Sequence, residues 1–343
     1  MNFASDNCAG VHPDIMAALL AANDGHVASY GHDRLTAQAH DRLRDLFEAP
    51  QAQVFLVASG TGANGLAISS LCPPWGRIFC HDTAHIETSE SGGPQWMAGG
   101  AQMTLLPGPH GRILPETLAQ ALVGHPQQDE HDGVNAVLSL TNATEWGTVY
   151  DPARLTALTA LAHQAGLSVH LDGARFANAV VATGASPADL TWRAGVDAVS
   201  FGATKNGCMA LEAVIFFNPD QARDFRFRRM RAGHLWSKHR FLAAQMLAYL
   251  NDGLWLRLAG QANQMAAGLA RGLVRAGHAP LAPVQANEVF VTLPRPLIAR
   301  LRGAGLRAAD WPQPGDDAGQ GTLRLVSSWA TTEAEVQAFL DAL

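Results

Sequence analysis

Seven short apolar runs, separated by segments long enough to form helices, constrain the fold of this chain more than any other feature. The runs lie between residues 53 and 217 and read VFLVA, RIFC, MTLL, NAVLSL, LSVHL, DAVSF and AVIFF. The segments between them carry helix signals: residues 151–166 open with Asp and Pro, place Leu and Ala at helical spacing, and end at Gly. This alternation predicts an α/β fold with a largely parallel seven-stranded sheet.

The C-terminal part of the sequence has a different pattern. A nearly continuous helical pattern covers residues 240–276 and is broken near 251–253, where Asn, Asp and Gly are adjacent. We place the domain boundary there, which gives a large domain over residues 1–250 and a smaller domain over residues 251–343. The smaller domain combines the strand-like runs NEVFVTL and GTLRLVSSW with helical segments, which predicts an α+β unit.

Composition excludes several classes of protein. The net charge of −6 offers no basic field, so we expect no nucleic-acid partner. The four cysteines lack CxxC spacing, and the N-terminus lacks the cationic and apolar parts of a signal peptide, so we expect a cytoplasmic protein. No apolar run approaches the ~18 residues of a membrane span. Spacings such as HExxH are absent, so we expect no catalytic metal.

The residues that follow the strands are the first place to search for a site, because ligands of open α/β sheets bind outside the carboxyl ends of the strands. After the first strand comes SGTGANG, in which glycines allow backbone N–H groups to approach a phosphate at a helix N-terminus. Gly60, Gly62 and Gly65 also satisfy GxGxxG, and Asp82 ends the next strand. An NAD-dependent dehydrogenase therefore stays open as an alternative.

Two further strands end near residues that could be chemically active. His85 lies just past the second strand, with Glu90 five residues later; a structural role for this histidine is the plain alternative. Asp172 ends the run LSVHL, and Arg175 follows it. A carboxylate at the end of a buried strand is costly unless it meets a cation or several hydrogen-bond donors, so Asp172 is either a partner for a positive group or a helix N-cap.

Lysine is rare in this sequence. The chain has 24 basic Lys and Arg residues, but only Lys205 and Lys238 are lysines. Lys205 follows the run DAVSF among small residues. Arginine cannot replace a lysine that must lose its proton, so Lys205 predicts imine chemistry. Together with a phosphate loop, His85 and Asp172, it describes a site for pyridoxal 5'-phosphate (PLP), whereas NAD would leave the lysine without a role.

These motifs resemble the bacterial low-specificity L-threonine aldolases, in the β-eliminating-lyase group of fold-type I PLP enzymes. The stretches FASDN, SYGHD, SGTGAN, TAHIET, TNATEWGTVY, HLDGARFANA, FGATKNG and NDGLWLR occur in the family's order. The resemblance implies a PLP-dependent transferase-like fold and a lyase that cleaves L-threonine, L-allo-threonine and other β-hydroxy-α-amino acids to glycine and an aldehyde by a retro-aldol reaction. A β-eliminating lyase or an amino-acid racemase would keep the same cofactor residues and stays an alternative.

The resemblance also implies roles for the cofactor residues. Lys205 would form the Schiff base with the cofactor, Asp172 would pair with the pyridine nitrogen, and His85 would stack on the ring. Gly60 and Thr61 would hold the phosphate.

Further matched positions concern the substrate and the assembly. Ser5, Arg175 and Arg324 match residues that hold the substrate carboxylate, and Arg175 also belongs to the cofactor set. Tyr30 and Lys238 match residues that reach a neighbouring subunit's site, Tyr30 towards the substrate and Lys238 towards the cofactor. The resemblance therefore implies a homo-oligomer, a dimer or tetramer, with shared sites.

The base that takes the β-hydroxyl proton is the position where this chain departs from its relatives. Some branches of the family carry ENTHN where this chain has TNATE, so Thr144 replaces a histidine. We therefore expect His85 to act as the base, through its second nitrogen or a water, with Glu90 to orient it.

Overall fold

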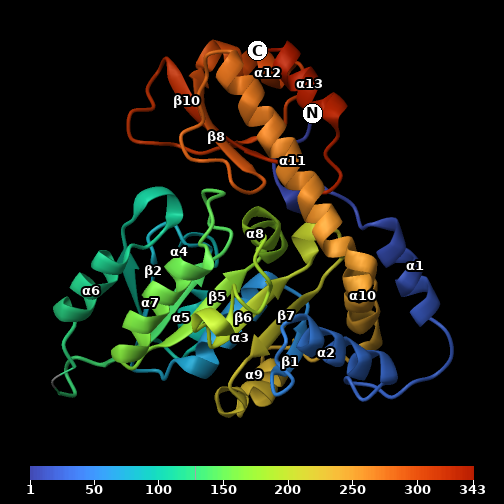
Figure 1. The fold of residues 1–343 in the computed structure, drawn as a ribbon, viewed down its shortest axis with the longest axis vertical. Helices are drawn as coiled ribbons and strands as arrows, with labels where there is room; N and C mark the ends of the chain where they lie inside the picture. Colours follow the sequence, from blue (N-terminus) through green and yellow to red (C-terminus); the bar gives the residue numbers. More distant parts are fainter. Residues whose placement is uncertain (128) are drawn as a thin grey trace.

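The computed structural model describes residues 1–127 and 129–343, which form two lobes of unequal size (Figure 1). The larger lobe is built on a seven-stranded sheet and the smaller lobe on a three-stranded sheet. Helix α11 (Leu254–Arg275) runs from one lobe into the other. The predicted α/β class with a mainly parallel sheet is confirmed.

All seven predicted runs form strands of the large sheet. Its order is β1-β7-β6-β5-β4-β2-β3, and β7 pairs antiparallel with both β1 and β6 while the other neighbours are parallel. The carboxyl ends of β2, β4, β5 and β6 therefore lie at one edge. The bounds are β1 (Gln53–Val57), β2 (Gly76–His81), β3 (Gln102–Leu106), β4 (Val134–Thr141), β5 (Ser168–Gly173), β6 (Ala198–Gly202) and β7 (Glu212–Phe216).

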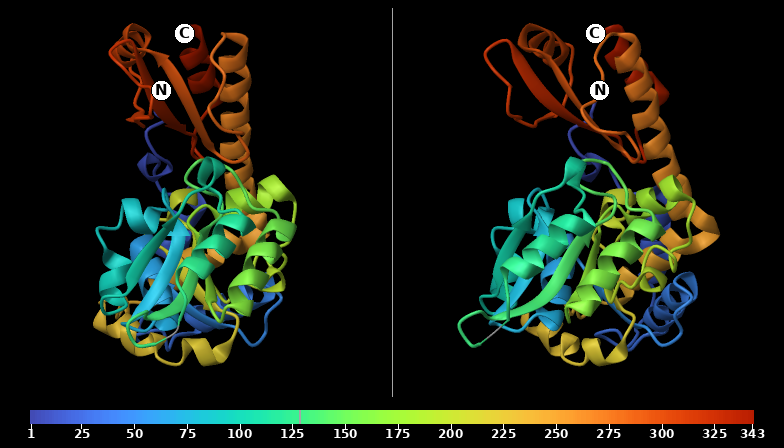
Figure 2. Two further views of the ribbon diagram at one scale, coloured as in Figure 1. Left: turned by 90° about the vertical axis from the view of Figure 1, so that its left-hand side faces the viewer. Right: turned by 60° about the vertical axis from the view of Figure 1, so that its left-hand side comes forward.

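Helices cover both faces of this sheet (Figure 2). Alternate residues of β7 enter opposite cores: Ile215 packs in one, and Val214 and Phe216 in the other. Strands buried on both faces read as continuous apolar runs, which is why the sequence marked them clearly. The helices of the large lobe are α1 (Pro13–Ala22), α2 (Arg34–Leu46), α3 (Gly60–Leu71), α4 (His85–Thr88), α5 (Gly93–Met97), α6 (Pro115–Gly124), α7 (Pro152–Gln164), α8 (Phe176–Thr183), α9 (Phe225–Arg231) and α10 (Arg240–Leu250).

The predicted helix break near residue 252 is present. Helix α10 ends at Leu250, the 3-10 turn η6 (Asn251–Gly253) follows, and α11 begins at Leu254. Asp252 has φ 47° and Gly253 has φ 67°, the left-handed region that ends regular helix. The first turns of α11 pack in the core of the large lobe and its later turns in that of the small lobe. One continuous helix thus connects the two cores.

The small lobe is an antiparallel sheet covered by helices. Its order is β8-β10-β9, and α12 and α13 pack with the end of α11 around it. Helix α13 opens with a capping box between Thr332 and Glu335. The two-residue strand β9 was not predicted. The bounds are β8 (Glu288–Pro294), α12 (Arg295–Gly303), β9 (Ala309–Asp310), β10 (Gln320–Val326) and α13 (Glu333–Asp341).

The N-terminus lies against the small lobe (Figures 1 and 2). Asn2 forms a β-bridge with Arg307, and Phe3 is fully buried in the core of the small lobe. Residues just after Phe3 consequently lie where the two lobes meet. The division of the chain at residue 251 stays a prediction.

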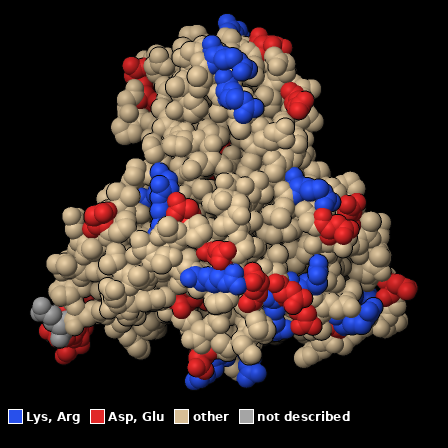
Figure 3. All heavy atoms as spheres, in the orientation of Figure 1, with Lys and Arg blue, Asp and Glu red and all other residues tan. Residues whose placement is uncertain are grey.

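The surface carries no continuous basic region on the face drawn in Figure 3, where Lys and Arg alternate with Asp and Glu over a mostly uncharged surface. In the part of the chain that the structure describes, none of the helices combines the length and the apolar character needed to span a bilayer.

Candidate active site

Two adjoining pockets lie at the carboxyl edge of the large sheet. The sheet-edge pocket, of about 270 Å³, is lined from the large lobe and from Asn7. The interlobe pocket, of about 110 Å³, is lined by the large lobe, by the N-terminal segment and by Trp311 and Arg324 of the small lobe. His85, Asp172 and Lys205 line both pockets. The structure therefore brings the three predicted catalytic residues together.

The first turn of α3 forms one end of the sheet-edge pocket. Ser59 caps the helix by accepting a hydrogen bond from the Gly62 N–H at 3.2 Å. The N–H groups of Gly60 and Thr61, which line the pocket, have no acceptor within the helix. Such groups favour a phosphate. A Cβ at Gly62 would lie 2.3 Å from the ring of His234, so a larger residue there would require that side chain to move.

Asp172 ends β5 and is almost fully buried. Its Oδ2 accepts a hydrogen bond from Asn64 Nδ2 at 2.9 Å, and its Oδ1 accepts one from the Ala174 N–H at 2.9 Å. The next helix, α8, has Arg175 as its N-cap, so Asp172 is not a helix cap. Two donors hold its carboxylate in the pocket, where it can still meet a positive group.

His85 opens α4 and is oriented by two carboxylates. Its Nδ1 lies 2.8 Å from Oε1 of Glu90, which also accepts a hydrogen bond from Asn64 Nδ2 at 3.0 Å. An ionised carboxylate can only accept, so Nδ1 donates to Glu90, and in the neutral imidazole the lone pair is on Nε2. The backbone N–H of His85 donates to Oε1 of Glu145 at 2.7 Å. The imidazole is 40% exposed and faces both pockets.

Lys205 lies in the 3-10 turn η4 (Thr204–Asn206), which directly follows β6. Within residues 1–127 and 129–343, its ammonium has no hydrogen bond or ion pair. The neighbouring Glu212 is buried, and its Oε2 accepts a hydrogen bond from the Ala203 N–H at 3.0 Å. Burial raises the pKa of Glu212 to about 7, although Lys205 and the hydrogen bonds oppose the shift.

Arginines define the interlobe pocket. Arg175 pairs with Asp6 through two hydrogen bonds, Nε to Oδ2 at 2.7 Å and Nη2 to Oδ1 at 3.0 Å. The guanidinium of Arg324 lies 5.1 Å from the ring centroid of Trp311, and its buried Nε has no hydrogen-bond partner in the described chain. Ser5 lines the same pocket. Arg175 lines only the interlobe pocket, not the sheet-edge pocket.

Some of the predicted residues lie outside both pockets. Tyr30 and Lys238 are exposed and lie near each other, since the Tyr30 N–H donates to the Ser237 carbonyl at 2.9 Å. Thr144 is fully buried and bonds to Thr148 Oγ1 at 2.9 Å. Asp82, the acid on which the NAD alternative depended, lies 3.1 Å from Nδ1 of His81 and lines neither pocket.

Several buried polar residues of the site were not found from the sequence. Each of them lies close in space to a predicted residue. Each also lines one of the two pockets or forms a hydrogen bond with a residue that lines one. The sequence carried a signal for Asp6 and Glu288. An acidic residue is unusual next to an apolar run that is expected to be buried, and these two stand beside FAS and within NEVFVTL. These residues are Asp6, Asn64, Glu145, Glu212 and Glu288.

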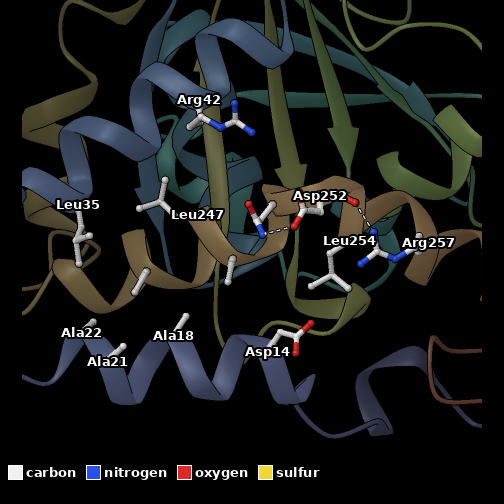
Figure 4. A pocket seen from close by; sticks show the side chains of 13 residues that line it. Asp14, Ala18, Ala21, Ala22, Leu35, Arg42, Leu247, Asp252, Leu254 and Arg257 are labelled. Carbon is white, nitrogen blue, oxygen red and sulfur yellow. Dashed lines mark hydrogen bonds between the residues drawn. The ribbon is translucent and has the colours of Figure 1, made fainter.

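A larger cavity lies elsewhere on the large lobe. It has a volume of about 770 Å³ and lies between α1, α2, α10 and the start of α11 (Figure 4). Ala18 and Ala21 of α1 point towards α10, which contributes Leu247 to the lining. None of the predicted site residues lines it, so its size does not make it the active site.

Comparison with known proteins gives the family. A family model described as beta-eliminating lyase matches residues 2–295. The chain belongs to this family. It is 43% identical over 330 residues to the low specificity L-threonine aldolase of Pseudomonas aeruginosa, which covers 96% of this chain and 93% of that protein.

Solved structures with a similar fold include a threonine aldolase and a more distant PLP-binding protein. The threonine aldolase of Leishmania major superimposes with a TM-score of 0.93 at 30% identity, over 99% of this chain and 97% of that one. A variant of serine palmitoyltransferase from S. paucimobilis, solved with PLP and myriocin bound, gives a TM-score of 0.72 at 18% identity, over 100% and 86%. The second likeness concerns the fold alone.

The raised pKa of Glu212 predicts how stability depends on pH. In the unfolded chain this carboxyl ionises near its ordinary value of 4.5, whereas in the fold it keeps its proton up to about pH 7. Its contribution to stability is thus present at low pH and is lost as the pH rises towards 7. Relative to wild type, Glu212→Gln should gain about 1–3 kcal/mol of unfolding free energy between pH 5 and pH 8.

Urea unfolding of the ligand-free protein across this pH range measures the effect. Glu116→Gln, at an exposed position, is the matched control and should follow the wild-type profile. If the Glu212→Gln and wild-type profiles run parallel, Glu212 titrates like an exposed acid and this account of it is wrong.

Proposed function

We propose that the protein is a PLP-dependent aldolase that cleaves L-threonine, L-allo-threonine and related β-hydroxy-α-amino acids to glycine and an aldehyde. The observation that carries the proposal is the position of Lys205. Lys205, whose ammonium has no partner among the described residues, lines both the pocket with the N-terminus of α3 and the pocket with two arginines. The family and the aldolase relatives support the same activity.

The sheet-edge pocket fits PLP at each part of the cofactor. Gly60 and Thr61 present N–H groups for the phosphate, Asp172 presents a carboxylate for the protonated pyridine nitrogen, and Lys205 presents the amine for the aldehyde. When bound, PLP supplies an aldehyde that captures the substrate amine and a ring that accepts the electron pair of the broken Cα–Cβ bond. Asp172 would pair with the protonated ring nitrogen and so favour the electron-accepting form of the ring.

The interlobe pocket fits the carboxylate of an amino acid. Arg324 has an unpartnered buried Nε, and Ser5 offers a hydroxyl beside it. Arg175 closes the other side, although two of its donors already serve Asp6. A carboxylate fixed at these residues would orient the bonds at Cα relative to the bound cofactor, and this orientation would select cleavage of Cα–Cβ.

His85 is the proton acceptor for the β-hydroxyl group. Glu90 holds the proton on Nδ1, so Nε2 is free to accept one, directly or through a water. Thr144, which stands where some relatives have a histidine, bonds to Thr148 away from the pockets and cannot share this task. The dehydrogenase alternative is disfavoured for a separate reason, because it would leave Lys205 without a role.

Product analysis on the purified holoenzyme tests the proposal against its alternatives. With L-threonine we expect acetaldehyde and glycine in equal amounts. Pyruvate plus ammonia from L-serine would identify a β-eliminating lyase, and loss of optical activity without cleavage would identify a racemase. Either result in the absence of acetaldehyde would contradict the proposed function. Comparing L-threonine with L-allo-threonine and L-phenylserine would then give the substrate preference.

We infer further that the working form is a homo-oligomer, a dimer or tetramer, in the cytoplasm. Tyr30 and Lys238 are exposed and lie together on the surface, where they can reach the site of a neighbouring subunit. All four cysteines are free thiols, which suits a reducing compartment. Sedimentation velocity should give twice or four times the mass of the chain. A fully active monomer would contradict shared sites.

A further inference from the structure

Four charged side chains meet where the N-terminal segment, the large lobe and the small lobe join. Asp6 comes from the N-terminal turn η1 (Asp6–Cys8), Arg175 from the N-cap of α8, Glu288 from the start of β8 and Arg324 from β10. Both carboxylate oxygens of Asp6 accept hydrogen bonds from Arg175. Oε1 of Glu288 lies 3.5 Å from Nη2 of Arg175, an ion-pair distance without a hydrogen bond.

The two acids of this cluster differ in the number of hydrogen bonds that they accept. Asp6 accepts two hydrogen bonds from Arg175 and one from Asn287 Nδ2 at 3.1 Å. Both carboxylate oxygens of Glu288 are buried, and neither has a hydrogen-bond partner in the described chain. A buried carboxylate without hydrogen bonds is costly in its charged form.

The pKa shifts of the two acids follow from this difference. Burial alone would raise the pKa of Asp6, but Arg175 and Lys205 lower it and the net shift is downward. Burial raises the pKa of Glu288, and Arg175 and Arg324 oppose this without reversing it. The hydrogen bonds of Asp6 therefore favour its charged form, whereas no hydrogen bond in the described chain stabilises the charge of Glu288.

The charges of the cluster decide whether it can take another carboxylate. Arg175 and Arg324 contribute two positive charges, and Asp6 contributes one negative charge. With Glu288 ionised the four sum to zero, so an incoming carboxylate would leave a buried negative charge. With Glu288 protonated they sum to one positive charge, which a carboxylate neutralises. The other titratable groups that line the interlobe pocket are His85, Glu145, Asp172 and Lys205.

We propose that Glu288 takes up one proton from solvent when the substrate carboxylate binds at Arg175 and Arg324. Once protonated, Glu288 no longer competes with the substrate carboxylate for the two arginines. Glu288 is therefore a positioning residue. The proton binds an oxygen of Glu288, and no other bond changes. This inference rests on the proposed function for the identity of the substrate, but the charge argument applies to any carboxylate in the pocket.

Proton uptake on binding makes substrate affinity depend on pH. As the pH rises, protonation of Glu288 costs more free energy, so the substrate binds more weakly. KM therefore rises, by at most about tenfold per pH unit. Gln has the shape and hydrogen-bonding capacity of the protonated acid. Glu288→Gln should therefore bind substrate as well as wild type at low pH and about tenfold more tightly at high pH, with little change in kcat.

Steady-state kinetics on the holoenzymes from pH 6 to 9 tests this. The ratio of wild-type KM to Glu288→Gln KM for L-threonine should increase with pH, because other titrations on the substrate and the enzyme are common to both. Glu333→Gln, which removes an exposed acid at the start of α13, is the control and should match wild type. A pH-independent ratio would overturn the inference while leaving the aldolase assignment intact.

Calorimetry provides a readout that needs neither turnover nor the variant. The probe is 3-hydroxybutyrate, which has the carboxylate and β-hydroxyl of the substrate but no amine. Titrating it into wild-type holoenzyme in two buffers of different ionisation enthalpy counts the protons exchanged. Above neutral pH we expect uptake of about one proton per bound ligand. Binding without proton uptake would overturn the inference, even if the enzyme proved not to be an aldolase.

Discussion

The burial of charge at the carboxyl edge of the parallel sheet is the constraint on which the rest of the site depends. Asp172 ends a strand that is covered on both faces, so its carboxylate needs donors, and Asn64 and the Ala174 N–H supply them. The Asn64 amide also bonds to Glu90, which in turn orients His85. One chain of hydrogen bonds thus connects Asp172, proposed for the cofactor nitrogen, with His85, proposed for the substrate hydroxyl, and a change at Asn64 would disturb both.

The two pockets divide the chemistry between the two lobes. The sheet-edge pocket is built almost wholly from the large lobe and fits the cofactor. The interlobe pocket depends on Trp311 and Arg324 of the small lobe and on the N-terminal segment, which packs with that lobe through Phe3. Helix α11 enters both cores and fixes the distance between them. In the proposed function, substrate binding would therefore depend on how the two lobes are arranged, whereas cofactor binding would depend mainly on the large sheet.

The sequence predicted the elements that have a strong local signal. Apolar runs marked all seven strands, and Asn251 to Gly253 marked the break before α11. The strand β9 escaped because two residues carry no periodicity, and the reversed direction of β7 depends on tertiary packing. Lys205, His85 and Asp172 were predicted because they follow strands. Asn64 and Glu288 were not, because their roles come from partners distant in sequence. The roles given to Tyr30 and Lys238 stay predictions, since they involve a second subunit.

The central claim is that one amine, that of Lys205, holds the cofactor at the edge of the sheet. Reduction of the holoenzyme with borohydride, followed by digestion and mass spectrometry of the peptides, tests it directly. The chain has only one other lysine, Lys238, so the labelled peptide distinguishes between two candidate side chains. We predict a pyridoxyl group on the peptide that contains Lys205. A group on Lys238, or an unmodified protein, would contradict the account.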